Sequence, residues 1–222
     1  ELDFPAKSGV RARIRIEEYT WDRIRTPDSS ARFIGSEEVG HSFVRNGQEV
    51  RTSEIVFDGE SVQVISGLKD LIVINTTNSE FWGYVKDKYT TLPEAYDRIL
   101  ATEVSARWRF DWTDDEQPMP DWDTSYAQVK KHMLQAFAET YSLSLQQTLY
   151  QMGARIIDNL GEIDEVRFSL PNKHHFLVDL KPFGLKNDNE VYYAADRPYG
   201  LIEATVLRDG CEPKIPVDLT NL

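Results

Sequence analysis

The stretch that decides the fold is residues 67–98, GLKDLIVINTTNSEFWGYVKDKYTTLPEAYDR. Its apolar segment at 71–77 has the composition of a β-strand. A polar segment that contains Phe81 and Arg98 follows. Residues 104–110 then alternate between apolar and polar side chains, which predicts a second strand. This strand pair begins a unit whose other elements lie downstream.

Two amphipathic helices are predicted after an acidic loop. Asp123 fits the N-cap of the first helix, which is expected to end near residue 141. Its apolar residues recur at spacings of three and four: Tyr126, Val129, Met133, Phe137 and Tyr141. The second helix begins with the capping box Ser144-x-x-Gln147 and is expected to run to Gly161.

The remaining elements of this unit are strands. They are predicted at 162–170, 174–180, 190–195 and 200–208. From residue 71 onward the order is therefore two strands, two helices and then further strands. This order predicts the α+β class, with an antiparallel β-sheet covered on one face by a helix pair.

Residues upstream of this unit are predicted to form strands and no helices. Positions 10–16 alternate strictly between apolar and arginine side chains, the pattern of a half-buried strand. The phase then slips, which indicates a bulge or a bend. Two further strands are expected at 41–45 and 50–57, joined by a hairpin turn at Asn46-Gly47.

The glycine-containing segment 58–70 carries the expected domain boundary. We place one unit at 1–66, which supplies only strands, and a second at 67–222, which contains the helix pair. The first unit looks like the back half of a unit similar to the second.

Charge and composition exclude several classes of partner. The 222 residues contain 25 Lys+Arg and 37 Asp+Glu, a net charge of −12. Such a chain repels nucleic acid and anionic lipid, so neither is expected as a partner. The longest apolar run, 191–195, is far shorter than the roughly 20 residues of a membrane helix.

The expected location is cytoplasmic. A single cysteine, Cys211, favours a reducing compartment. The chain has neither a signal-peptide pattern nor a C-terminal Ser-Lys-Leu motif. It begins with Glu1 rather than Met, so we expect it to start partway through a longer gene product.

The segment at 67–98 resembles the urate oxidase (uricase) family. The resemblance rests on the motif Thr-Thr-x-Ser-x-Phe at 76–81, followed by Tyr84, Tyr89, Leu92 and Arg98. Later segments agree at 137–139, 145–150, 169–176 and 198–202. One departure is Asn75, where the family usually has Lys, and no chemical role is carried over to it.

The resemblance implies a tunnelling fold (T-fold), in which sheet-and-helix-pair units of four subunits close into a barrel with active sites between subunits. It also implies oxidation of urate by dioxygen and water to 5-hydroxyisourate and hydrogen peroxide, with no metal and no organic cofactor. Deprotonated urate is electron-rich enough to reduce oxygen. The protein then only has to orient the purine, take a proton and place oxygen and water.

By this resemblance, Arg98 and Gln146 bind opposite ends of the purine. A guanidinium offers paired donors in a rigid plane, which suits a urate carbonyl oxygen and a ring nitrogen. Gln146 lies in the first turn of a helix, where backbone N–H groups are free, and the Leu145 N–H is expected to hold the same oxygen. From the residues alone, the alternatives are a surface ion pair for Arg98 and a solvated side chain for Gln146.

The resemblance also gives roles to an aromatic and an apolar residue. Phe81 is expected to stack on the purine face, and Leu92 to line the pocket. Ordinary core packing is the alternative for Phe81.

Asn172 and His174 are two residues apart on an expected strand and should face the same side. The resemblance implies that Asn172 holds oxygen or water above the ring and that His174 belongs to a proton relay. His174 and His175 could instead be metal ligands. Adjacent strand residues face opposite sides, however, and no Cys, Asp or Glu is suitably clustered, so no metal site is expected.

The family's Lys–Thr pair and its neighbouring Asp have no match. Lys7 and Thr20 stand outside the family context, so we expect these roles from a segment missing here. Competing interpretations are a non-catalytic purine- or pterin-binding module on the same fold, and a subunit that pairs with a separate N-terminal chain.

Overall fold

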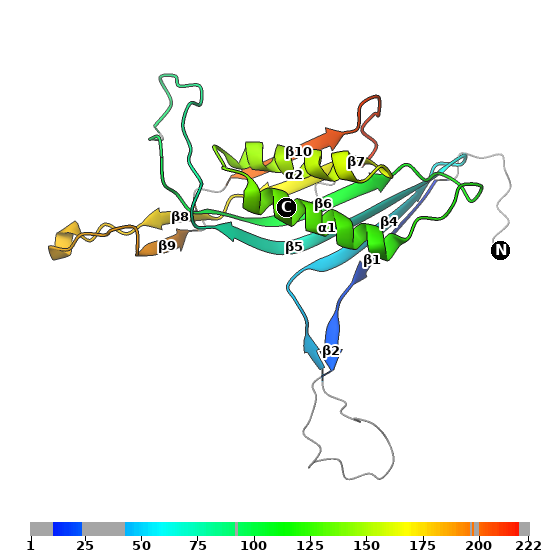
Figure 1. The fold of residues 1–222 in the computed structure, drawn as a ribbon, viewed down its shortest axis with the longest axis horizontal. Helices are drawn as coiled ribbons and strands as arrows, with labels where there is room; N and C mark the ends of the chain where they lie inside the picture. Colours follow the sequence, from blue (N-terminus) through cyan, green and yellow to red (C-terminus); the bar gives the residue numbers. More distant parts are fainter. Residues whose placement is uncertain (1–10, 24–42, 92, 196, 198–199, 218–222) are drawn as a thin grey trace, which may run out of the picture.

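The computed structural model describes residues 11–23, 43–91, 93–195, 197 and 200–217. Their main feature is a six-stranded sheet in the order β1-β4-β5-β6-β7-β10 (Figure 1). The strands are Ala12–Glu18 (β1), Val50–Phe57 (β4), Val62–Asn75 (β5), Leu100–Phe110 (β6), Ile163–Pro171 (β7) and Leu201–Leu207 (β10). Every neighbouring pair is antiparallel, as the sequence predicts.

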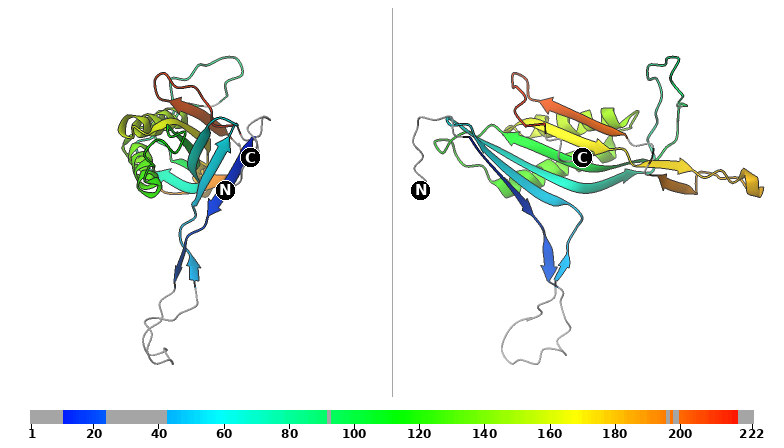
Figure 2. Two further views of the ribbon diagram at one scale, coloured as in Figure 1. Left: turned by 90° about the vertical axis from the view of Figure 1, so that its right-hand side faces the viewer. Right: turned by 180° about the vertical axis from the view of Figure 1, so that it is seen from behind.

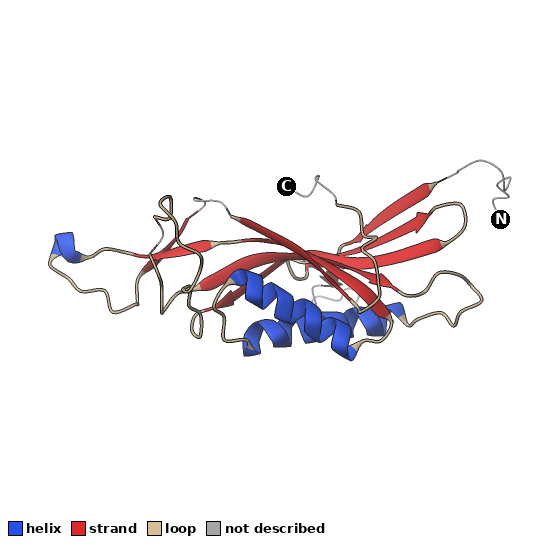
Figure 3. Ribbon diagram, turned by 90° about the horizontal axis from the view of Figure 1, so that it is seen from above, coloured by secondary structure: helices blue, strands red, loops and turns tan. Residues whose placement is uncertain are grey.

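Two helices, α1 (Trp122–Glu139) and α2 (Leu145–Asn159), cover one face of the sheet (Figure 3). The core lies between these layers, and its fully buried side chains include Trp108, Met133, Leu149, Met152, Ile156, Val166 and Phe168. Alternation along β6 and β7 sends every second side chain into this core. The predicted α+β architecture is confirmed. Within the described residues, no helix has the length and apolar character to cross a membrane.

Smaller elements project from the main sheet (Figures 1 and 2). β2 (Trp21–Arg23) pairs with β3 (Phe43–Arg45), and β8 (His174–Leu177) pairs with β9 (Tyr192–Ala195). One turn of 3-10 helix, η2 (Lys181–Phe183), lies between β8 and β9. The loop between β5 and β6 also stands away from the sheet.

The predicted hairpin at Asn46-Gly47 is wrong. β3 pairs with β2, whereas β4 pairs with β1, so the two strands that flank this turn belong to different sheets. The Asn46 N–H donates to the Thr20 carbonyl oxygen at 2.9 Å. The turn therefore carries the chain from the small β2–β3 sheet into the main sheet. On the partner segment, the break between β1 and β2 does the same, and this is where the phase slip predicted a bulge or a bend.

The N-cap of α1 is Asp121 and not Asp123. The Asp121 carboxylate accepts a hydrogen bond from the Thr124 N–H at 3.0 Å. Asp123 lies in the first turn instead, and its carboxylate pairs with the Arg51 guanidinium at 2.6 Å. The helix ends two residues before Tyr141, which is therefore not part of the buried stripe.

The sheet runs without a break across the expected domain boundary. β5 begins at Val62 rather than at residue 71 and contains both residues 66 and 67. The division into 1–66 and 67–222 stays a prediction about two related halves.

The helix pair leaves part of the sheet uncovered. By strand alternation and register, Ile14, Ile16 and Ile55 share a face with Val64, which packs in the core. Yet Ile14 is 58% and Ile16 is 55% exposed. Among the described residues, the apolar face of β1 is therefore bare.

Candidate functional site

Backbone pairs hold the loop between β5 and β6 in place on both of its sides. The Phe81 N–H donates to the Ala95 carbonyl at 2.7 Å, and the Ala95 N–H donates back at 2.9 Å. On the other side, the Ser142 N–H donates to the Asn78 carbonyl at 2.9 Å, and the Glu80 N–H donates to the Ser142 carbonyl at 2.7 Å. The loop thus connects the start of β6 with the entry to α2.

Arg98 projects from the end of this loop. Its backbone N–H donates to the Ser79 carbonyl at 3.0 Å, and its Nε–H donates to the Glu80 carbonyl at 3.1 Å. One terminal nitrogen of the guanidinium is buried without a hydrogen-bond partner. No carboxylate of the described residues forms an ion pair with it, and burial lowers the pKa of Arg98 from its ordinary value.

This geometry argues for a ligand. A guanidinium stays charged at neutral pH, and buried donors in proteins are nearly always paired. The surface ion pair that was the alternative for Arg98 is therefore not what the structure shows.

The Phe81 ring lies beside this guanidinium. The Arg98 Cζ is 5.3 Å from the centroid of the ring. Phe81 also stacks with Tyr84, with ring centroids 4.7 Å apart and planes tilted by 17°. Phe81 is half-buried and is not a member of the core cluster, so core packing does not account for it.

Leu145 and Gln146 occupy the first turn of α2, as predicted. The N-cap is confirmed, because the Gln147 N–H donates to Ser144 Oγ at 3.1 Å. The Gln147 side chain completes the cap one residue earlier than a capping box does, since its Oε1 accepts from the Leu143 N–H at 2.7 Å. The side chain of Leu145 is buried in the core, so only its backbone can face a ligand, whereas Gln146 is exposed.

The single strand expected to carry Asn172 and His174 is broken. Asn172 forms an isolated bridge to Thr102, the Lys173 N–H donates to the Ala101 carbonyl at 2.9 Å, and β8 begins only at His174. The chain leaves the main sheet at this point, so strand alternation does not place Asn172 and His174 on one face.

The contact between Lys173 and Ala101 brings the start of β8 near Arg98. Burial lowers the pKa of His174, and the positive charge of Arg98 and the neighbouring His175 lower it further. The His174 ring stacks on Phe176 with centroids 5.8 Å apart. With a pKa below its ordinary value near 6.5, this imidazole is mostly neutral at pH 7.

The structure thus places Arg98 against Phe81 and close enough to His174 for its charge to lower the pKa of that ring. Ser142 joins the loop to the segment that leads into α2, whose first turn carries Gln146. Leu92 lies outside the described residues. In the part of the chain that the structure describes, no group of three or more His, Cys, Asp or Glu residues is arranged to hold a metal ion.

Two residues of this loop had no role in the sequence analysis. The Ser79 hydroxyl is buried and has no hydrogen-bond partner, and Glu80 holds Arg98 through its carbonyl. Ser79 belongs to the motif at 76–81, but the motif does not reveal that its hydroxyl is buried. Glu80 has the sequence context of an ordinary surface acid.

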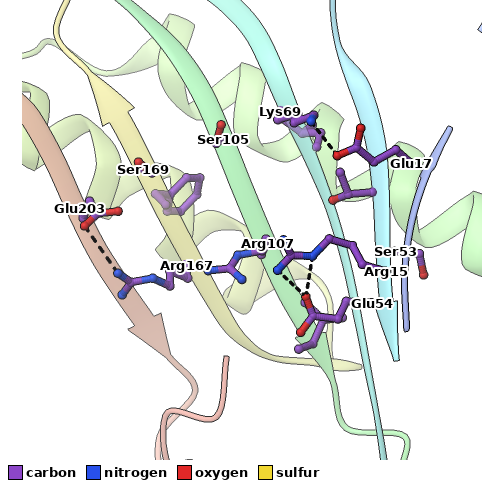
Figure 4. Close-up of a pocket in the computed structure, with 14 residues that line it drawn as sticks. Arg15, Glu17, Ser53, Glu54, Lys69, Ser105, Arg107, Arg167, Ser169 and Glu203 are labelled. Carbon is purple, nitrogen blue, oxygen red and sulfur yellow. Dashed lines mark hydrogen bonds and ion pairs between the residues drawn. The ribbon is translucent and has the colours of Figure 1, made fainter. Parts of the chain in front are cut away.

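A recess of about 50 Å³ lies on the open face of the sheet, away from Arg98 (Figure 4). Arg15, Arg107 and Arg167 line it from β1, β6 and β7. Arg15 pairs with Glu54 at 3.0 Å, and Arg167 lies 3.7 Å from Glu203. Arg107 donates to the Pro216 carbonyl oxygen at 2.8 Å. Because all three cations already have partners within the protein, the recess is a poorer candidate for a substrate site.

Comparisons with known proteins point to one family. The family model described as Uricase matches residues 64–203. The uricase of Arthrobacter globiformis is 50% identical over 201 residues, which cover 90% of this chain and 61% of that protein. The uricase of Aspergillus flavus is 39% identical over 184 residues, which cover 79% of this chain and 61% of that protein. The chain therefore spans about three fifths of the length of these relatives.

Solved structures agree with this. The crystal structure of the Arthrobacter globiformis uricase superposes with a TM-score of 0.80 at 50% identity, covering 93% of this chain and 66% of that one. A uricase from Bacillus fastidious, at 24% identity and a TM-score of 0.67, supports the fold alone. The sheet with its helix pair is thus a T-fold. Since the family model matches more than half of its residues, the chain belongs to the uricase family.

Proposed function

We propose that the site around Arg98 binds urate and that the whole protein oxidises it with dioxygen and water. The observation that carries this proposal is the buried guanidinium nitrogen of Arg98, which has no partner and lies beside the half-buried ring of Phe81. A planar, anionic purine supplies both an acceptor for the guanidinium and a face for the ring.

In this proposal, Arg98 and Gln146 bind the two ends of the purine. The guanidinium donates to a carbonyl oxygen and a ring nitrogen of urate. The amide of Gln146 and the backbone N–H of Leu145 bind the far end, because the first N–H groups of α2 have no partner within the helix. Phe81 stacks on one purine face, and Leu92 lines the pocket.

Asn172 and His174 serve the chemistry. Urate gives two electrons to dioxygen, the oxygen of water becomes the hydroxyl group at C5, and dioxygen leaves as hydrogen peroxide, so that 5-hydroxyisourate is formed. We assign to Asn172 the placement of oxygen or water above the ring, and to His174 the transfer of a proton. The lowered pKa of His174 favours the neutral imidazole, which can accept one.

The general base is assigned outside these residues. The family's Lys–Thr pair has no match among the 222 residues. We therefore propose that the 222 residues supply the substrate-binding wall and that a separate segment supplies the base. We further propose four subunits that close into a barrel, with the ion-paired open face of Figure 4 toward its water-filled interior.

The same purine-binding wall also fits a second candidate. A T-fold with an intact purine-binding wall and no base would be a non-catalytic purine- or pterin-binding module. It would bind urate without ever releasing peroxide.

Two measurements on the 222-residue protein test these proposals. An anaerobic titration with urate, measured by calorimetry, should show weak but saturable binding. In air, loss of urate absorbance with equimolar peroxide should be about 10²- to 10⁴-fold slower than for the Arthrobacter globiformis uricase, since a positioned base contributes about that factor.

The outcomes separate the candidates. No urate binding by the folded protein would overturn the purine site. Binding without peroxide, even after the upstream segment of the Arthrobacter globiformis enzyme is added, would favour the non-catalytic module. Full activity from the 222 residues alone would show that a base lies within them.

A further inference from the structure

Every polar group of Glu80 is engaged. Its N–H donates to the Ser142 carbonyl at 2.7 Å, and its carbonyl accepts from the Arg98 Nε–H at 3.1 Å. Its carboxylate accepts from the indole N–H of Trp82 at 2.5 Å and from the hydroxyl of Tyr141. One residue thus contacts three separate parts of the loop and helix entry.

The contact with Arg98 determines how the guanidinium is presented. An arginine side chain loses considerable rotamer freedom when a ligand immobilises it. When the Nε–H is already bound to a fixed carbonyl, the plane of the guanidinium is set before the ligand binds. The buried terminal nitrogen is then left to face the ligand.

The carboxylate connects this carbonyl to α2. Tyr141 directly precedes Ser142, whose N–H and carbonyl pair with residues 78 and 80, and α2 begins three residues later with Leu145. The bond from Tyr141 to Glu80 therefore ties the start of α2 to the residue that holds Arg98.

We propose that Glu80 is a positioning residue that fixes the Arg98 guanidinium relative to the first turn of α2, and so sets the span across which a planar purine is bound. This inference rests on the proposed function for the identity of the ligand. It gives Glu80 no contact with urate.

The loop offers a matched control. Glu94 also accepts a hydrogen bond from a tyrosine hydroxyl, that of Tyr96 at 2.9 Å, and pairs with Lys86 at 2.8 Å. These contacts lie within the loop and reach neither Arg98 nor Ser142. Glu94→Ala and Tyr96→Phe therefore remove the same kind of hydrogen bond without affecting the proposed span.

The first measurement is anaerobic urate affinity of the 222-residue protein. Glu80→Ala removes the carboxylate bonds to Trp82 and Tyr141 but keeps the backbone carbonyl that accepts from Arg98. It should weaken urate binding about 10-fold, which corresponds to about 1.4 kcal/mol. Glu80→Gln keeps an oxygen for Trp82 and an NH₂ group for the Tyr141 oxygen, so it should restore affinity to within about 3-fold. Tyr141→Phe combined with Glu80→Ala should be no worse than Glu80→Ala alone. The control variants should bind as the parent does.

The second measurement needs no ligand. The Nε–H resonance of Arg98, assigned by its loss in Arg98→Lys, should shift and exchange faster with water in Glu80→Ala, and remain unchanged in Glu94→Ala. Should Glu80→Ala fail to fold, Tyr141→Phe, which keeps the ring, replaces it in both measurements with an expected loss of affinity of about 3-fold.

The outcomes are distinct. Parent-like urate affinity and an unchanged Arg98 resonance in Glu80→Ala would overturn the positioning role and leave the proposed function intact. A parent protein that does not bind urate would overturn the proposed function. In that case a shifted Arg98 resonance in Glu80→Ala would still support the positioning of the guanidinium.

Discussion

The covered and bare parts of the sheet carry similar apolar alternation but bury it very differently. In the covered part, Val166 and Phe168 on β7 are 0% exposed beneath the helix pair. In the bare part, Ile14 and Ile16 on β1 are 58% and 55% exposed. Alternation therefore reveals which face of a strand is apolar, and only the helices determine whether that face is buried.

The candidate site belongs to neither of these parts. Phe81 and Arg98 lie in a loop beyond the end of the covered part, half-buried and outside the core cluster. Residues there can leave a charged donor without a partner because they do not have to pack the core. This difference predicts that core, bare face and site respond separately to mutation.

The largest expected effect is on the core. Phe168→Ala should lower the free energy of unfolding by roughly 3–5 kcal/mol, because it removes a fully buried ring and leaves a cavity. Ile16→Ala on the bare face should change it by no more than about 0.5 kcal/mol. Urea unfolding followed by circular dichroism measures both. A comparable loss in Ile16→Ala would mean that something covers β1 in solution.

The next effect is on the site. Arg98→Lys should weaken anaerobic urate binding by about 1.5–3 kcal/mol, since a point charge does not reproduce two parallel hydrogen bonds from one plane. Stability toward urea should barely change. Arg155→Lys, which alters a surface ion pair with Glu139, is the control and should bind urate normally. Unchanged affinity in Arg98→Lys would remove this residue from the site.

Much of the covered part could be predicted from the sequence. The 3.6-residue periodicity located both helices, and the Ser144-x-x-Gln147 pattern located the start of α2, because these signals arise from local contacts. The misplaced cap of α1 shows the limit of such signals. Two aspartates were available, and a tertiary contact with Arg51 engaged the second one.

Pairing between distant segments was harder to predict. Asn46-Gly47 has the composition of a hairpin turn, but pairing of β4 with β1 competes with the local hairpin. For the candidate site, the motif at 76–98 predicted roles for Phe81 and Arg98, and these roles stay predictions. The burial of the guanidinium and the contacts of Glu80 depend on Ser142 and Tyr141, which are about 60 residues away in the sequence. No local pattern reports such contacts.

The smallest expected effect is a pH dependence of the free energy of unfolding that arises from His174, at the start of β8. Burial first, and then Arg98 and His175, lower the pKa of His174 in the folded chain below its ordinary value of 6.5. The unfolded chain therefore binds a proton there more readily, so this contribution to stability is complete above about pH 6.5 and is lost as the pH falls below it. Between pH 7.5 and pH 5.5, His174→Gln should lose less unfolding free energy than the parent protein. An identical loss in the parent and in His174→Gln would show that neither burial nor the charge of Arg98 lowers the pKa of His174, and would remove this evidence that the two residues lie in one site.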